Sequence, residues 1–264
     1  MPFLEVPGAR IYYEVTGAGP PLVFAHGLGG NHLSWWQQLS AFEDRYTCVV
    51  FSHRGFAPSS EEPGGPGATA FAADLAALIN HLGFEKVRLV AQSMGGWTCL
   101  AYALQSPERV KALVMCDTTG TLAHPAFPAI HAAQPRGREQ GLFERGMHPA
   151  AGERMADEQP ALHRLYWQIN NLAVGLEKDA LRRQLGQLRT TPPEALATLN
   201  MPVLCLAGEE DIVIPPETVQ LAAGCFPRGR FVSVPKAGHS VYFERTAEFN
   251  KLVGNFLAEA ERGD

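Results

Sequence analysis

The sequence lacks long apolar runs and clusters of basic residues, and both absences narrow the possible functions. No apolar run approaches the roughly 20 residues that a membrane-spanning helix needs. No Lys- or Arg-rich run occurs, and the formal net charge is −5, which argues against nucleic-acid binding. We therefore expect a small-molecule substrate as the partner, with neither nucleic acid nor a membrane. The oligomeric state stays open.

The sequence also lacks a visible leader and paired cysteines. Its first eight residues contain no basic segment followed by an apolar one, so no secretory signal is apparent. Five cysteines form an odd set without any C-x-x-C pair, which indicates neither a disulfide framework nor a zinc site. Free cysteines of this kind are typical of a reducing compartment, so we expect a cytoplasmic protein.

What is present is the pattern of an α/β protein. Short, wholly apolar strands alternate with amphipathic helices, as in a parallel sheet covered on both faces. The expected strands are a hairpin within residues 3–16 and the segments 22–25, 46–51, 87–91, 110–115, 202–207 and 231–234. One helix is expected around Trp35, Trp36, Leu39 and Phe42, and the others cover about 69–82, 94–105, 160–172, 175–188, 216–225 and 247–260.

The alternation stops after Asp117 and resumes near Pro202. The intervening stretch is rich in proline and shows helical patches but no convincing strand. We interpret it as an insertion that lies over the sheet. The expectation is one domain over residues 1–264, with a core of 1–118 and 200–264 and a helical cap over about 119–199.

The segment from Val87 to Leu100 is the most informative stretch of the chain. A buried strand ends at Ala91, a helix begins soon after, and Gln92-Ser93-Met94-Gly95-Gly96 must turn sharply between them. Ser93 is thereby placed at the end of a strand and the start of a helix, where backbone N–H groups face an incoming group. A glycine-rich connection without catalysis is the alternative interpretation.

This stretch resembles the nucleophile elbow G-x-S-x-G of the α/β-hydrolases, with Ala91 in place of the first glycine. The resemblance covers essentially the whole chain. It implies a mostly parallel eight-stranded sheet with helices on both faces and a helical lid insertion. The branch that looks closest is that of the small serine esterases and enol-lactonases.

A serine nucleophile needs a base that is oriented by an acid. The base candidate is His239, which follows the last expected strand, and the acid candidate is Asp211, which follows the strand before it. The chain order Ser93, Asp211, His239 is the order that the resemblance implies. Asp117 is a rival acid position, and Glu209 and Glu210 lie nearby but out of register with the family pattern.

The resemblance also implies an oxyanion hole, formed by the backbone N–H groups of Leu28 and Met94. We expect a moderate-sized, largely apolar pocket under the lid, with Trp97, Trp167 and Val213 among its residues. We expect His26 to brace the loop that contains Gly27 and not to react.

Together these features predict a cofactor-free and metal-free serine hydrolase of a small, largely apolar ester or lactone, acting through an acyl-enzyme. A carbon–carbon bond hydrolase of ring-cleavage products is the runner-up. Such relatives typically show H-G-x-G-P-G and a Trp soon after the catalytic His, and both features are missing around His26 and His239. A cofactor-free perhydrolase and a catalytically silent ligand-binding relative remain further alternatives.

Overall fold

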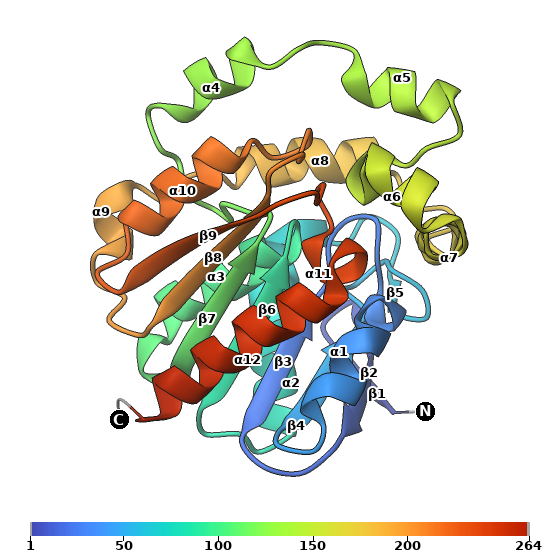
Figure 1. The fold of residues 1–264 in the computed structure, drawn as a ribbon. Coiled ribbons are helices and arrows are strands. Elements are labelled where there is room, and N and C mark those ends of the chain that lie inside the picture. Colours follow the sequence, from blue (N-terminus) through green and yellow to red (C-terminus); the bar gives the residue numbers. More distant parts are fainter. Residues whose placement is uncertain (1, 263–264) are drawn as a thin grey trace.

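The computed structural model describes residues 2–262, so residues 1, 263 and 264 of the expected domain lie outside the described part. It contains a nine-stranded sheet with helices on both faces (Figure 1). The main strand order is β1-β2-β4-β3-β6-β7-β8-β9, and β5 pairs with β2. The strands are β1 (Phe3–Val6), β2 (Ala9–Thr16), β3 (Pro21–Ala25), β4 (Thr47–Phe51), β5 (Ser60–Glu61), β6 (Val87–Gln92), β7 (Val110–Cys116), β8 (Val203–Gly208) and β9 (Gly229–Val234).

The sheet is mostly parallel, as the sequence predicts. Strands β4, β3, β6, β7, β8 and β9 run parallel to one another, while β1 and β2 form the expected antiparallel hairpin. The ninth strand, β5, is not predicted by the sequence, because two residues are too few to show an alternating pattern.

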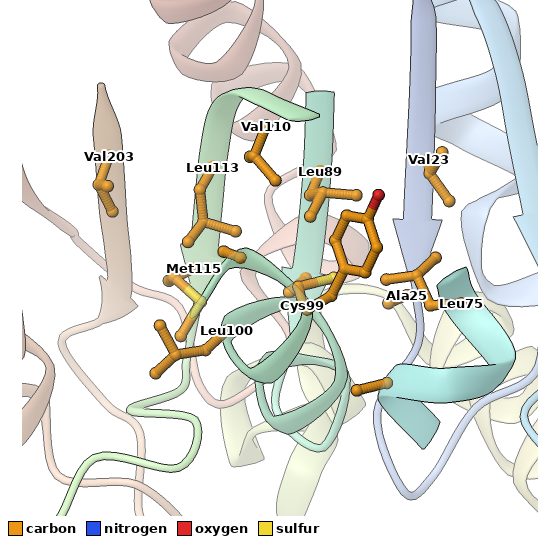
Figure 2. Close-up of a cluster of buried hydrophobic side chains, with 14 of the residues drawn as sticks. Val23, Ala25, Leu75, Leu89, Cys99, Leu100, Val110, Leu113, Met115 and Val203 are labelled. Carbon is orange, nitrogen blue, oxygen red and sulfur yellow. The ribbon is translucent and has the colours of Figure 1, made fainter. Parts of the chain in front are cut away.

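Alternating side chains of the central strands form two cores. In β6, Leu89 and Ala91 belong to one core, whereas Val90 belongs to the other. Figure 2 shows the first core, in which strand residues such as Val23 and Leu113 pack against helices. Every residue of β6 is buried, so this strand has no solvent face, and apart from Arg88 and Gln92 its residues are apolar.

Each core is closed by its own helices. The first core is covered by α2 (Phe71–His81), α3 (Gly95–Gln105) and α10 (Pro216–Gly224). The second is covered by α1 (Trp36–Phe42), α11 (Val241–Glu244) and α12 (Thr246–Arg262). Short 3-10 turns precede α1 and α2, and α11 is a single turn that the sequence pattern does not reveal.

Residues 119–199 form a helical segment between β7 and β8. Its helices are α4 (Phe127–Ala133), α5 (Arg138–Glu144), α6 (Glu153–Glu158), α7 (Pro160–Asn171), α8 (Lys178–Gln187) and α9 (Pro193–Leu196). Figure 1 shows α4, α5, α6 and α8 gathered at one end of the sheet. The segment is joined at its base, where Leu122 and Thr191 form an isolated parallel bridge. Within residues 2–262 no helix has the length and apolar character needed to cross a membrane.

Candidate active site

Ser93 occupies a sharp turn between β6 and α3. Its φ of 49° lies in the left-handed region, which a non-glycine residue enters only where the surrounding structure holds it. The two glycines that follow allow this close packing. A Cβ at Gly95 would overlap the carbonyl oxygen of Ala25, and one at Gly96 would overlap the side chain of Thr118. The turn therefore requires glycine at both positions, and the elbow motif predicts the first of them, Gly95.

Ser93, His239 and Asp211 form a continuous chain of hydrogen bonds. The Nε2 atom of His239 lies 2.8 Å from the Oγ atom of Ser93. On the other side of the ring, Nδ1 lies 2.8 Å from the Oδ2 atom of Asp211. Burial lowers the pKa of His239, but the charge and hydrogen bond of Asp211 outweigh this effect and raise it overall. The three residues follow the ends of three parallel strands. Along the hydrogen bonds they stand in the order nucleophile, base and acid, which is the order that nucleophilic catalysis needs.

Asp211 is itself held in place by backbone N–H groups. Its Oδ1 atom accepts hydrogen bonds from the backbone nitrogens of Val213 at 2.8 Å and Ile214 at 3.0 Å. The Oδ2 atom is thus left to face His239. This division of the two carboxylate oxygens fixes the orientation of the imidazole.

Asp117, the rival acid position, contacts other groups. Its carboxylate accepts hydrogen bonds from the backbone nitrogens of Gly208 at 3.0 Å and Val241 at 3.3 Å. Burial and the neighbouring charge of Asp211 raise the pKa of Asp117 to about 7. Its contacts join the ends of β7 and β8 to the start of α11, and no hydrogen bond connects it to His239 within residues 2–262.

The two glutamates beside the acid candidate also point elsewhere. Glu210 forms an ion pair with Arg154 of α6, with 2.5 Å between the nearest atoms. Glu209 is exposed. Neither carboxylate therefore competes with Asp211 for the imidazole.

Two buried side chains, to which the sequence alone assigns no role, hold the loop that carries His239. The Nε2 atom of Gln92 donates to the carbonyl oxygen of His239 at 2.7 Å. Glu244 accepts from the backbone nitrogens of Gly238 at 2.9 Å and Ser240 at 3.0 Å. Burial raises the pKa of Glu244 to about 8 despite these two donors. The only sequence signal for Glu244 is an acidic residue directly after three apolar ones.

Leu28 and Met94, the expected oxyanion donors, both line the cavity that contains Ser93. Within residues 2–262 neither backbone nitrogen donates a hydrogen bond, which leaves both N–H groups available. The loop that carries Leu28 is braced by His26. The Nε2 atom of His26 accepts a hydrogen bond from the backbone nitrogen of His53 at 3.0 Å. Burial lowers the pKa of His26 to about 3, so this ring is neutral and structural.

A cavity of about 350 Å³ opens above Ser93 and His239. Trp97 and Val213 line it, as expected, together with residues of α5, α7 and α8. Trp167 does not line it. Instead its indole packs against His148, with 4.8 Å between the ring centroids, and so lies one layer behind the wall.

The described residues hold no group of three or more His, Cys, Asp or Glu side chains arranged to bind a metal ion.

Comparisons with known proteins agree with this architecture. Residues 20–147 match a family model described as the alpha/beta hydrolase fold, and residues 185–264 match one described as TAP-like protein. The chain belongs to the α/β-hydrolase superfamily, and its relatives include esterases and lactonases.

Three relatives illustrate the range of this superfamily. The "Putative carbamate hydrolase RutD" of Azorhizobium caulinodans is 26% identical, over 99% of this chain and 100% of its own. An esterase of Thermogutta terrifontis is 27% identical, with a TM-score of 0.78 over 98% of this chain and 97% of its own. Est816, described as an N-acyl homoserine lactone degrading enzyme, is 26% identical, with a TM-score of 0.81 over 97% of this chain and 100% of its own.

Proposed function

We propose that this chain is a serine hydrolase that cleaves a carboxylic ester or a lactone through an acyl-enzyme on Ser93. The observation that carries the proposal is the chain of hydrogen bonds from Ser93 through His239 to Asp211, with 2.8 Å at each link. The likeness to an esterase and to a lactone-degrading enzyme supports this substrate class.

In the first half-reaction, the Oγ atom of Ser93 attacks the carbonyl carbon as its proton passes to Nε2 of His239. Asp211 keeps the proton on Nδ1, so Nε2 carries the lone pair that accepts it. The resulting imidazolium is stabilised by the Asp211 carboxylate, which is buried beside it. The free N–H groups of Leu28 and Met94 bind the oxyanion, and each such donor is worth about 3–4 kcal/mol in other hydrolases.

The first half-reaction ends when the tetrahedral intermediate collapses and the imidazolium of His239 protonates the departing alkoxide. In the second half-reaction, water attacks the acyl-enzyme, gives its proton to the same nitrogen and releases the acid. Ser93 regains its proton, so the cycle consumes one water and produces one acid and one alcohol. For a lactone, both groups remain in one molecule.

We also propose that the helical segment of residues 119–199 is the cap of this site. Residues of α5, α7 and α8 line the cavity that contains Ser93, so the segment covers the nucleophile. A cap of this kind limits the size of the substrate and shields the acyl-enzyme from bulk water.

The test is a substrate panel measured with the wild-type chain and with Ser93→Ala. The panel contains p-nitrophenyl esters of increasing acyl length, several lactones and a vinylogous diketone. We expect hydrolysis of esters or lactones that falls by at least a thousandfold in Ser93→Ala. The matched control is Ser40→Ala, because Ser40 is exposed on α1 and its hydroxyl only contacts a backbone carbonyl. It should leave the rates unchanged.

Each contrary outcome has a definite meaning. Ester hydrolysis that persists in Ser93→Ala would contradict the triad mechanism. Turnover of the diketone alone would indicate a carbon–carbon hydrolase, and ester turnover that is faster with peroxide as acyl acceptor would indicate a perhydrolase. Tight ligand binding without any turnover would identify a catalytically silent relative.

A further inference from the structure

One face of α8 turns cationic side chains toward Ser93. Lys178, Arg182 and Leu185 are spaced by about one helical turn and line the same cavity, and Arg189 follows just beyond the end of the helix. The indole of Trp97 donates a hydrogen bond from Nε1 to the carbonyl oxygen of Leu185 at 2.9 Å. This bond joins α8 directly to the helix that follows the nucleophile.

Two of these cations are partly buried and have no carboxylate partner within residues 2–262. The Nζ atom of Lys178 contacts the carbonyl oxygen and Oδ1 of Asn170, at 3.2 and 2.6 Å. Arg189 donates to the hydroxyl of Thr119 at 2.8 Å, and its guanidinium lies 4.6 Å from the ring centroid of Trp97. Burial lowers the pKa of both groups, that of Lys178 to about 8. A partly desolvated cation without a counter-ion is costly, and an anionic ligand would relieve this cost.

The other charged groups of the cavity do not cancel this field. Arg182 forms an ion pair with Asp179 at 2.6 Å, but both side chains are largely exposed. Glu139 is the single acidic residue of the described lining, and it is exposed on α5. Burial lowers the pKa of His148 to about 4, so this ring adds no charge at neutral pH. The lining of the cavity therefore carries a net positive charge. The sequence predicts a largely apolar pocket and does not predict this charge.

Resting on the function proposed above, we propose that the substrate is an ester or lactone that carries a carboxylate. One of the two cations, Lys178 or Arg189, binds this carboxylate while the scissile carbonyl lies at Ser93. Apolar residues such as Met94 and Ile214 contact the carbon chain between the two groups. Since Lys178 and Arg189 lie at opposite ends of α8, the residue that binds the anion determines on which side of the scissile bond the carboxylate lies.

The test compares two esters that differ only in charge: phenyl hydrogen adipate and its terminal amide, phenyl adipamate. The succinate and glutarate pairs vary the spacing. We expect kcat/KM to favour the acid over the amide by at least about tenfold in one pair, the size of a single charge-assisted hydrogen bond. Added NaCl should reduce this ratio, because salt screens the attraction.

Variants identify the residue responsible. Lys178→Gln or Arg189→Gln should bring the ratio of acid to amide toward one, and Arg189→Lys should retain part of it. A purely structural role for Arg189 would lower both rates equally and leave the ratio unchanged. The matched control is Arg183→Gln, since Arg183 is exposed on α8 and does not line this cavity. It should leave the ratio at the wild-type value.

The two proposals fail in different ways. A wild-type ratio of one or less in every pair, or a ratio that neither variant changes, would overturn the anionic substrate. If the amide is still hydrolysed in a Ser93-dependent way, the serine hydrolase mechanism stands. Absence of Ser93-dependent hydrolysis of these esters and of every ester and lactone in the first panel would overturn the mechanism itself.

Discussion

Replacing Asp211 by Asn separates the two acid candidates, because it changes the proton on His239 while keeping the shape of the side chain. Backbone N–H groups of Val213 and Ile214 point at Oδ1, so the amide oxygen of the new Asn must occupy that position. Its NH₂ group then faces Nδ1 of His239, 2.8 Å away in the wild type. A donor facing Nδ1 forces the imidazole proton onto Nε2.

With a proton on Nε2, the imidazole cannot accept the proton of Ser93. We expect Asp211→Asn to lower kcat by about 10³- to 10⁴-fold, as the wrong tautomer does in other triads. This loss corresponds to roughly 4–5 kcal/mol of transition-state stabilisation. The assay is kcat on a p-nitrophenyl ester, with thermal unfolding measured in parallel.

Asp117→Asn is the matched comparison. Its side chain accepts backbone hydrogen bonds from Gly208 and Val241 and makes none to His239. The amide can replace one acceptor but not both, so stability should fall by about 1–3 kcal/mol. The activity of the folded protein should stay within about tenfold of wild type. The reverse ranking of the two variants in kcat would refute the assignment of Asp211 as the acid.

Two further predictions concern stability. Burial raises the folded-state pKa of Glu244 from 4.5 to about 8, so its protonated form contributes stability that is complete below pH 4.5 and is lost as the pH rises through about 8. Glu244→Gln should remove this part of the pH dependence in urea titrations at pH 5 and pH 9, whereas Glu248→Gln, on the exposed side of α12, should not. The buried Arg54 contacts Asp74 at 2.6 Å, so Arg54→Met should lower the free energy of unfolding by about 3–5 kcal/mol. Arg230→Met, at an exposed ion pair, should cost no more than about 1 kcal/mol in the same measurement.

Local sequence was sufficient for the elements and for the nucleophile turn. Fully apolar strands predict the parallel sheet, because a strand buried on both faces has no polar side. The Ser93 turn could be predicted because Ser93 and Gly95 form a short local motif, although the contacts that require glycine come from the distant residues Ala25 and Thr118. Motif position was also sufficient to propose His239, since the ends of parallel strands meet at one edge of a sheet.

Other features depended on residues far apart in the sequence. Asp117 and Asp211 both follow the ends of strands. Asp211 faces the imidazole because the backbone N–H of Val213 holds its other carboxylate oxygen. Likewise, Gln92 meets the carbonyl of His239 across 147 positions of the chain. No local pattern encodes such a contact, because it depends on how two loops pack.

The helical segment of residues 119–199 shows the same division. Its sequence predicted helices, and α7 and α8 lie where they were expected. The Trp97 indole bonds the Leu185 carbonyl of α8, and the Trp167 indole of α7 packs against His148, and both contacts join residues far apart in the sequence. The sequence by itself determined the sheet, its order of elements and the reactive turn, because these follow from neighbouring residues. The tertiary structure alone decided which acid contacts the imidazole and which charged side chains line the cavity, because both depend on contacts between distant segments.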